Sequence, residues 1–108
     1  MMNFSNSKDF DKDFKKLSKK YKSLKEDLSL FKKFISKIPL GNSKHFNIIF
    51  EGKCAYVLKA RLACQYLKGS SLRIIYSYNA EEKHIEFIEL YYKGNQENHT
   101  ISRISSCK

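Results

Sequence analysis

Residues 56–64 read Tyr-Val-Leu-Lys-Ala-Arg-Leu-Ala-Cys, and this stretch decides the fold. Successive side chains of a β-strand point to opposite faces of a sheet. Strand geometry therefore places both cations, Lys59 and Arg61, on one face. The other face is apolar and carries Tyr56, Leu58, Ala60, Leu62 and Cys64. A strand with one apolar and one cationic face predicts a sheet with a core on one side and a phosphate-holding surface on the other.

Two further runs have the same strand character. Residues 72–78 place Arg73 on the face opposite Leu72, Ile74, Tyr76 and Tyr78, and residues 85–92 form the third strand candidate. The links at 68–71 and 79–83 are too short for parallel crossovers, which need a dozen residues or more, so the three strands are predicted to be antiparallel neighbours. Residues 46–50 have the pattern of one more short strand.

The first third of the chain is predicted to be helical. In residues 8–20, Phe10, Phe14 and Leu17 recur at helix spacing, followed by Tyr21, with lysines on the opposite side. Ser5, Asn6 or Ser7 can cap the start of this helix.

A second helix is predicted to begin at residues 23–26, where Ser-Leu-Lys-Glu fits a capping box. It is predicted to end at Pro39 and Gly41. Its apolar stripe comprises Leu24, Leu28, Phe31, Ile35 and Ile38, widened by Leu30 and Phe34.

These elements predict a single α+β domain spanning residues 1–108. An N-terminal helical hairpin packs on one face of a small antiparallel sheet, and a short helix within residues 95–106 follows. The helices are expected to cover the apolar strand face, which leaves the face with Lys59, Arg61 and Arg73 open to solvent or a partner.

The composition narrows the class of partner. The chain has 21 Lys and Arg against 11 Asp and Glu, a net charge of +10, and its 42% hydrophobic content is typical of a folded globule. Nucleic acid is the leading partner class, ahead of an anionic membrane or an acidic protein. The three cysteines, Cys54, Cys64 and Cys107, form no CxxC motif and are predicted to be free thiols in a reducing cytoplasm. We expect no cofactor, no metal site and no membrane span.

Few side chains offer acid–base chemistry. Alternation along 85–92 places Glu89 and Tyr91 on one face with Ile85 and Phe87, and it places Ile88, Leu90 and Tyr92 on the other. A carboxylate inside an apolar strand needs a partner, so Glu89 is predicted to form a structural ion pair with Arg73 or Arg61. Outward cations are also normal on a half-exposed sheet, where edge lysines prevent aggregation.

Four segments, at 10–28, 58–63, 72–76 and 88–98, occur in an order and spacing that resemble the RelE/ParE superfamily of bacterial type II toxin–antitoxin toxins. The RelE/HigB-like mRNA interferase branch is the better fit. The resemblance implies a ribosome-dependent endoribonuclease that cuts mRNA, and an antitoxin with an acidic or amphipathic segment that neutralises it. In such enzymes the RNA 2′-hydroxyl attacks the neighbouring phosphate, so the protein supplies mainly cations that stabilise the developing charge.

By position, the resemblance implies catalytic roles for Lys59, Arg61, Arg73 and Lys93. Tyr91 is the candidate for acid–base work, and Tyr92, Lys68 and His99 are candidates for RNA contact. No residue matches the family's general base cleanly. Two alternatives stay open: a ParE-like DNA gyrase poison, and a non-catalytic basic binding module.

Overall fold

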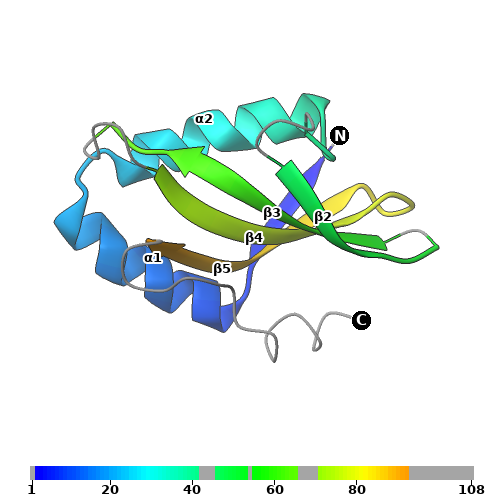
Figure 1. Ribbon diagram of the computed structural model, residues 1–108, viewed down its shortest axis with the longest axis horizontal. Helices are drawn as coiled ribbons and strands as arrows, with labels where there is room; N and C mark the ends of the chain where they lie inside the picture. The colour runs from blue at the N-terminus through cyan, green and yellow to red at the C-terminus, as the bar shows by residue number, and fades with distance from the viewer. Residues whose placement is uncertain (1, 42–45, 54, 66–70, 93–108) are drawn as a thin grey trace.

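The computed structural model describes residues 2–41, 46–53, 55–65 and 71–92, which form one five-stranded sheet with two helices (Figure 1). The predicted α+β class is confirmed. The predicted helix within 95–106 lies outside the described residues. Neither described helix is long and apolar enough to cross a membrane. In chain order the elements are β1 (Asn3–Asn6), α1 (Lys8–Lys20), α2 (Leu24–Lys37), β2 (Phe46–Glu51), β3 (Ala55–Ala63), β4 (Ser71–Asn79) and β5 (His84–Tyr92).

The strands lie in the order β1-β5-β4-β3-β2. The pairs β3–β4 and β4–β5 are antiparallel, as the short links predicted, and β2 also pairs antiparallel with β3. β1 was not predicted, and it pairs in parallel with β5, from Asn3 opposite His84 to Asn6 opposite Phe87. Its sequence, Asn-Phe-Ser-Asn, is polar and short, so no strand period could reveal it. The sheet is therefore mixed, with β1 and β2 at its edges.

Local hydrogen bonds explain where the helices begin. Ser7 caps α1, because its hydroxyl accepts a hydrogen bond from the Phe10 backbone N–H at 3.0 Å. The capping box predicted at Ser23 is wrong: the Ser23 hydroxyl instead donates to the Asp27 carboxylate at 2.8 Å. Ser23 has helical backbone angles (φ −84°, ψ −3°) and not the extended conformation in which a serine caps a helix, as Ser7 does.

α2 ends at Lys37, just before the predicted stop at Pro39 and Gly41, and the Gly41 N–H donates to the Ile38 carbonyl at 2.9 Å. Gly41 has a φ of 67°, a conformation that side chains disfavour. A Cβ there would also lie 2.2 Å from the Phe46 ring, so position 41 has no room for a side chain.

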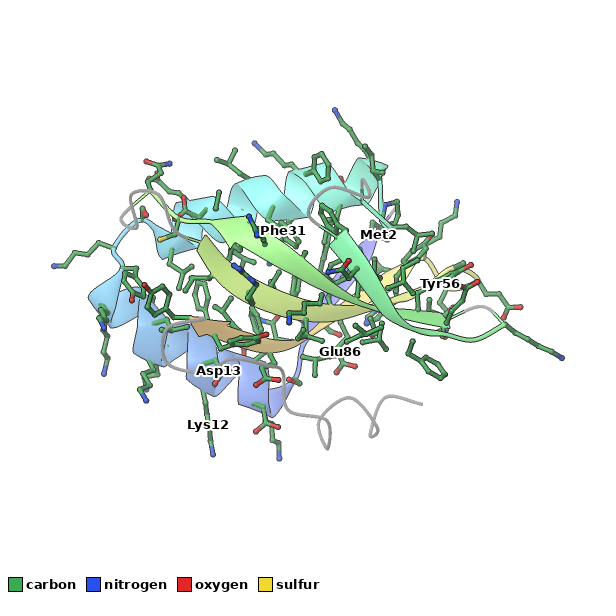
Figure 2. All side chains as sticks on the ribbon, in the orientation of Figure 1. Met2, Lys12, Asp13, Phe31, Tyr56 and Glu86 are labelled. Carbon is green, nitrogen blue, oxygen red and sulfur yellow. The ribbon has the colours of Figure 1, made fainter. Side chains whose placement is uncertain are left out.

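The main core lies between the helices and the near face of the sheet. Phe10 and Leu17 of α1, with Phe31 and Ile35 of α2, pack on buried side chains of β3, β4 and β5. Figure 2 labels Phe31 on α2, where its ring meets the Tyr76 ring edge-on at 5.8 Å between centroids. Tyr76 is fully buried, and its hydroxyl donates to the Pro39 carbonyl at 2.7 Å.

The predicted apolar stripe of α2 is only partly buried. Leu24, Leu28, Phe31 and Ile35 enter the core as predicted. Leu30, Phe34 and Ile38 do not, with exposed fractions of 58%, 38% and 46%. The helix has more apolar width than the sheet beneath it can cover.

The predicted alternation along β5 is wrong over its first half, because the strand contains a β-bulge. Ile75 of β4 stands opposite Glu89, but the next residue, Tyr76, stands opposite Phe87. Ile88 is therefore the extra residue of the bulge, and side chains before it change face. Ile85 and Phe87 join Leu90 in the main core, whereas Ile88 joins Tyr91 on the far face.

Candidate active site on the distal face of the sheet

The sheet face turned away from the helices is here called the distal face. It carries Lys59 and Arg61 of β3, Arg73 and Ile75 of β4, and Glu89 and Tyr91 of β5. Residues that stand opposite one another on the three neighbouring strands form two rows across the sheet. Arg61, Arg73 and Tyr91 form the first row, and Lys59, Ile75 and Glu89 form the second. Adjacent strands lie about 4.8 Å apart, so each row spans roughly 10 Å.

In both rows, the side chains on β3 are more exposed than those on β5. Arg61 is exposed and Lys59 and Arg73 are half-buried, whereas Glu89 and Tyr91 are only 1% and 5% exposed. The guanidinium groups can thus reach a ligand, and the groups on β5 lie deeper. The distal face is less open than the sequence predicted.

A small apolar cluster explains this burial. Val57, Ile75, Ile88 and Tyr91 pack together, with Ile49 and Phe50 of β2 against them. Val57, Ile75 and Tyr91 reach this face by alternation, and the bulge adds Ile88 to them. Strict alternation could not reveal this addition, although the unbroken apolar run at 48–50 and the pair Ile74–Ile75 are typical of strands buried on both faces.

The Tyr91 hydroxyl is the most unusual polar group of the site. It is buried, and no described residue provides it with a hydrogen-bond partner. Burial raises the pKa of Tyr91, the Glu89 carboxylate raises it further, and the Arg73 guanidinium lowers it. A phenol is protonated near neutral pH in any case, and this shift leaves it so, which lets the hydroxyl donate a hydrogen bond to a ligand. Buried polar groups are nearly always satisfied, which makes this donor a candidate for ligand contact.

The backbone around the bulge is held by residues of the N-terminal segment. The Ser7 hydroxyl donates to the Ile88 carbonyl at 2.9 Å, and the Ser7 N–H donates to the Phe87 carbonyl at 2.9 Å. The Asp13 carboxylate accepts from the Leu90 N–H at 3.1 Å. Figure 2 labels Asp13, which lies on α1 beside β5. These positioning residues were missed by sequence reasoning, which considered Ser7 only as a helix cap.

The structure brings together only part of the predicted site. Lys59, Arg61, Arg73, Glu89 and Tyr91 share the distal face. Tyr92 lies on the other face, half-buried against Tyr21 at 6.4 Å between ring centroids. Glu89 stands opposite Ile75, so its predicted ion pair with Arg73 would run diagonally across the ladder. Lys68, Lys93 and His99 lie outside the described residues, as do Cys54 and Cys107.

Groups suited to metal binding do not gather in the described part of the chain, where no three His, Cys, Asp or Glu residues are placed to hold an ion. Cys64 is buried and carries a free thiol.

Comparison with known proteins supports the fold. The chain is similar to a chain of the crystal structure of the archaeal RelE–RelB complex from Pyrococcus horikoshii, with a TM-score of 0.66 and 20% sequence identity. The similarity covers 86% of this chain and 96% of the archaeal one. No family model and no curated protein sequence matches the chain. The architecture is therefore RelE-like, as the resemblance implied, and at this identity the similarity concerns the fold.

Proposed function

We propose that this chain is the toxin of a type II toxin–antitoxin module and a ribosome-dependent endoribonuclease. Its distal face would hold the scissile phosphate of mRNA in the bacterial cytoplasm. The observation that carries the proposal is the row formed by Arg61, Arg73 and Tyr91, in which two guanidinium groups adjoin a protonated hydroxyl without a described partner. The similarity to a chain of a RelE–RelB complex supports a cognate antitoxin as partner.

The chemistry follows from these residue types. The RNA 2′-oxygen attacks the neighbouring phosphorus as its proton passes to water, the bond from phosphorus to the 5′-oxygen breaks, and this oxygen takes up a proton, which leaves a 2′,3′-cyclic phosphate and a 5′-hydroxyl. Negative charge builds on the phosphoryl oxygens, where the planar, always charged guanidinium groups of Arg61 and Arg73 donate paired hydrogen bonds. Lys59, two residues along β3 from Arg61, adds positive charge beside them. Such charge stabilisation is the largest contribution that a protein makes to this kind of reaction.

Tyr91 would donate rather than accept. Its phenol is protonated near neutral pH, so it can donate a hydrogen bond to a phosphoryl oxygen or a proton to the departing 5′-oxygen. The apolar cluster of Val57, Ile75 and Ile88 keeps water away from this group and so strengthens its interaction with charge.

The test is inducible expression in a bacterial host of three proteins: the wild type, Arg73→Ala, and the control Lys19→Ala. Lys19 is an exposed cation in the last turn of α1, so its removal changes net charge equally without touching the distal face. The wild type and Lys19→Ala should arrest growth and produce mRNA cuts at fixed codon positions in primer extension. Arg73→Ala should do neither, while it remains folded by circular dichroism.

The alternatives give different results in the same experiment. Growth arrest with intact mRNA and induction of the DNA-damage response would favour a gyrase poison. Folded wild type without any effect on growth would favour a non-catalytic binding module. An Arg73→Ala variant as toxic as the wild type would contradict the site assignment.

A further inference from the structure

β2, like β5, contains a β-bulge, and this bulge changes the face to which Phe50 points. Ile48 of β2 stands opposite Leu58 of the main core, but the next aligned pair is Phe50 opposite Val57, so Ile49 is the extra residue. Strict alternation from Ile48 would place Phe50 on the core face. The bulge places it on the distal face instead, which is a common use of bulges beside functional sites.

Phe50 lies at the margin of the distal face. β2 is the outer strand on this side of the sheet (Figure 1). Phe50 packs against the apolar cluster that contains Val57 and Tyr91, and it is half-buried. An aromatic ring supported from one side and partly open to solvent is typical of a platform on which a nucleic-acid base stacks, because every base has a flat π-face.

The neighbouring row supplies polar groups. Asn47 of β2 stands opposite Lys59 of β3, so both side chains belong to the distal face. Asn47 is exposed and Lys59 is half-buried. Val57, Lys59 and Arg61 follow one another at two-residue steps along β3, about 7 Å per step. Lys59 therefore lies between the row of Phe50 and the arginine row of the proposed active site.

Charge along the distal face separates a place for phosphate from a place for a base. The row of Phe50 continues across the sheet with Val57, Ser77 and Glu86, the last of which Figure 2 labels on β5. These four described residues include one carboxylate and no cation. The two other rows contain the cations of the site. Phosphates therefore favour the cationic rows, and the row of Phe50 favours an uncharged base.

We propose that Phe50 and Asn47 form a base-reading subsite for the mRNA, in which a base stacks on the Phe50 ring and the Asn47 amide binds the edge of that base. An asparagine amide offers one donor and one acceptor side by side, which matches N7 and the N6 amino group of adenine. Single-stranded RNA exposes these edges, so adenine is the favoured base. The inference rests on the proposed function, because it deepens the site at which that function places RNA.

The test measures binding without cleavage. Fluorescein-labelled RNA hexamers with 2′-O-methyl groups, which lack the attacking hydroxyl, are titrated with the full-length protein at low salt, and binding is followed by anisotropy. The probes are hexa-adenylate, hexa-uridylate and an abasic strand with the same sugar–phosphate backbone. The wild type should bind hexa-adenylate about ten-fold or more tightly than the abasic strand, as expected for a base stacked on an aromatic side chain.

Two variants test the two residues. Phe50→Leu retains an apolar cover for the cluster but removes the flat ring, so it should weaken binding of hexa-adenylate about five-fold or more and leave the abasic strand within about two-fold of the wild type. Asn47→Ala changes an exposed side chain, so the fold should tolerate it. It should reduce the preference for hexa-adenylate over hexa-uridylate about five-fold or more.

The matched control is Phe4→Leu. Phe4 is a half-buried phenylalanine on β1, the opposite edge strand, and it stacks on Phe87 at 5.9 Å between ring centroids in the main core. Phe4→Leu should bind all three probes as the wild type does. Circular dichroism confirms that each variant is folded before it is titrated.

Equal affinity of the wild type for hexa-adenylate and the abasic strand would overturn the proposal, whether both bind or neither does. A folded Phe50→Leu variant with wild-type affinity for hexa-adenylate would overturn it too, and so would an equal loss for the abasic strand, because Phe50 would then only support the sheet. An unchanged adenine preference in Asn47→Ala would overturn the role of Asn47.

The proposed function is decided by a separate measurement, the mRNA cuts produced by the wild type. If the wild type makes no cuts but its binding follows the expected pattern, the endoribonuclease assignment fails and the base-reading subsite stands. If the wild type makes cuts but Phe50→Leu binds hexa-adenylate normally, the subsite fails and the endoribonuclease assignment stands.

Discussion

The Asp13 carboxylate accepts a hydrogen bond from the backbone N–H of Leu90 at 3.1 Å, directly after the β-bulge of β5 and one residue before Tyr91. This bond joins α1 to the edge of β5 beyond the end of β1, whose pairing stops at Phe87. Without this bond, the Leu90 N–H would be a buried backbone donor with no acceptor, which is energetically costly. A side chain of α1 therefore binds the edge of β5 where β1 no longer pairs with it, and this bond holds the backbone next to Tyr91.

We expect Asp13→Ala to lower the free energy of unfolding by about 1–3 kcal/mol, because it leaves the Leu90 N–H unsatisfied. Asp13→Asn should cost less, since its amide oxygen can still accept the bond. Urea denaturation measures the two differences. Hydrogen exchange at Leu90 should accelerate in Asp13→Ala, and an unchanged exchange rate would show that the bond contributes nothing to this part of the strand.

The Ser7 hydroxyl forms hydrogen bonds with both α1 and β5. It accepts from the Phe10 N–H and donates to the Ile88 carbonyl of the bulge. Ser7→Ala should therefore destabilise the protein by about 1–3 kcal/mol, more than loss of a helix cap alone. Ser7→Asp retains the cap acceptor but cannot donate to Ile88, so it separates the two contributions. If Ser7→Asp proves as stable as the wild type in urea denaturation, the bond to the bulge is energetically unimportant.

Much of the architecture could be predicted because the hydrophobic periods of α1, β3 and β4 are strong. The cationic face of β3 and the position of Arg73 follow from alternation alone, and register then aligns Arg61 with Arg73. The RelE-like fold was reached through the order of these segments.

Other features depend on contacts far apart in the sequence. The bulge at Ile88 is bound by Ser7, and Leu90 after it by Asp13; both partners lie more than 70 positions earlier, so no local pattern could indicate these contacts. The polar strand β1 is stable only because β5 pairs with it. The exposure of Leu30 was missed for a related reason: periodicity shows that a helix side is apolar, but the width of the sheet decides how much of it is buried.

Tyr76 makes stability sensitive to alkaline pH. Its hydroxyl is buried against the Pro39 carbonyl, and burial raises the pKa of Tyr76 well above its usual value. Below about pH 10 the tyrosine is neutral in both the folded and the unfolded chain, so its contribution to stability is fully present there. Above that pH the unfolded chain ionises first, and stability is lost at up to about 1.4 kcal/mol per pH unit for this group.

Tyr76→Phe should therefore show two effects. At pH 7 it should be destabilised by about 1–2 kcal/mol, because the Pro39 carbonyl loses its donor. Between pH 10 and 11.5 its stability should fall less steeply than that of the wild type. Guanidinium denaturation over this pH series measures both, and parallel curves for the two proteins would contradict the assignment of the alkaline loss to Tyr76.

Tyr91→Phe separates chemistry from packing. The Tyr91 hydroxyl is buried with no described hydrogen-bond partner, so its removal should leave the free energy of unfolding unchanged or slightly higher. The ring should keep its place in the cluster with Val57, Ile75 and Ile88. If the hydroxyl donates to the phosphate or to the departing oxygen, mRNA cleavage should fall by about 100-fold or more.

The two measurements together are decisive. A Tyr91→Phe protein that is stable yet inactive in ribosome-programmed mRNA cleavage would assign a chemical role to the hydroxyl. The matched control is Tyr56→Phe, since Tyr56 is a half-buried tyrosine on the core face of β3 that stacks on Tyr78 at 6.3 Å. This control should retain activity. A Tyr91→Phe protein with wild-type activity would restrict the role of Tyr91 to packing and leave the chemistry to the arginines of the distal face.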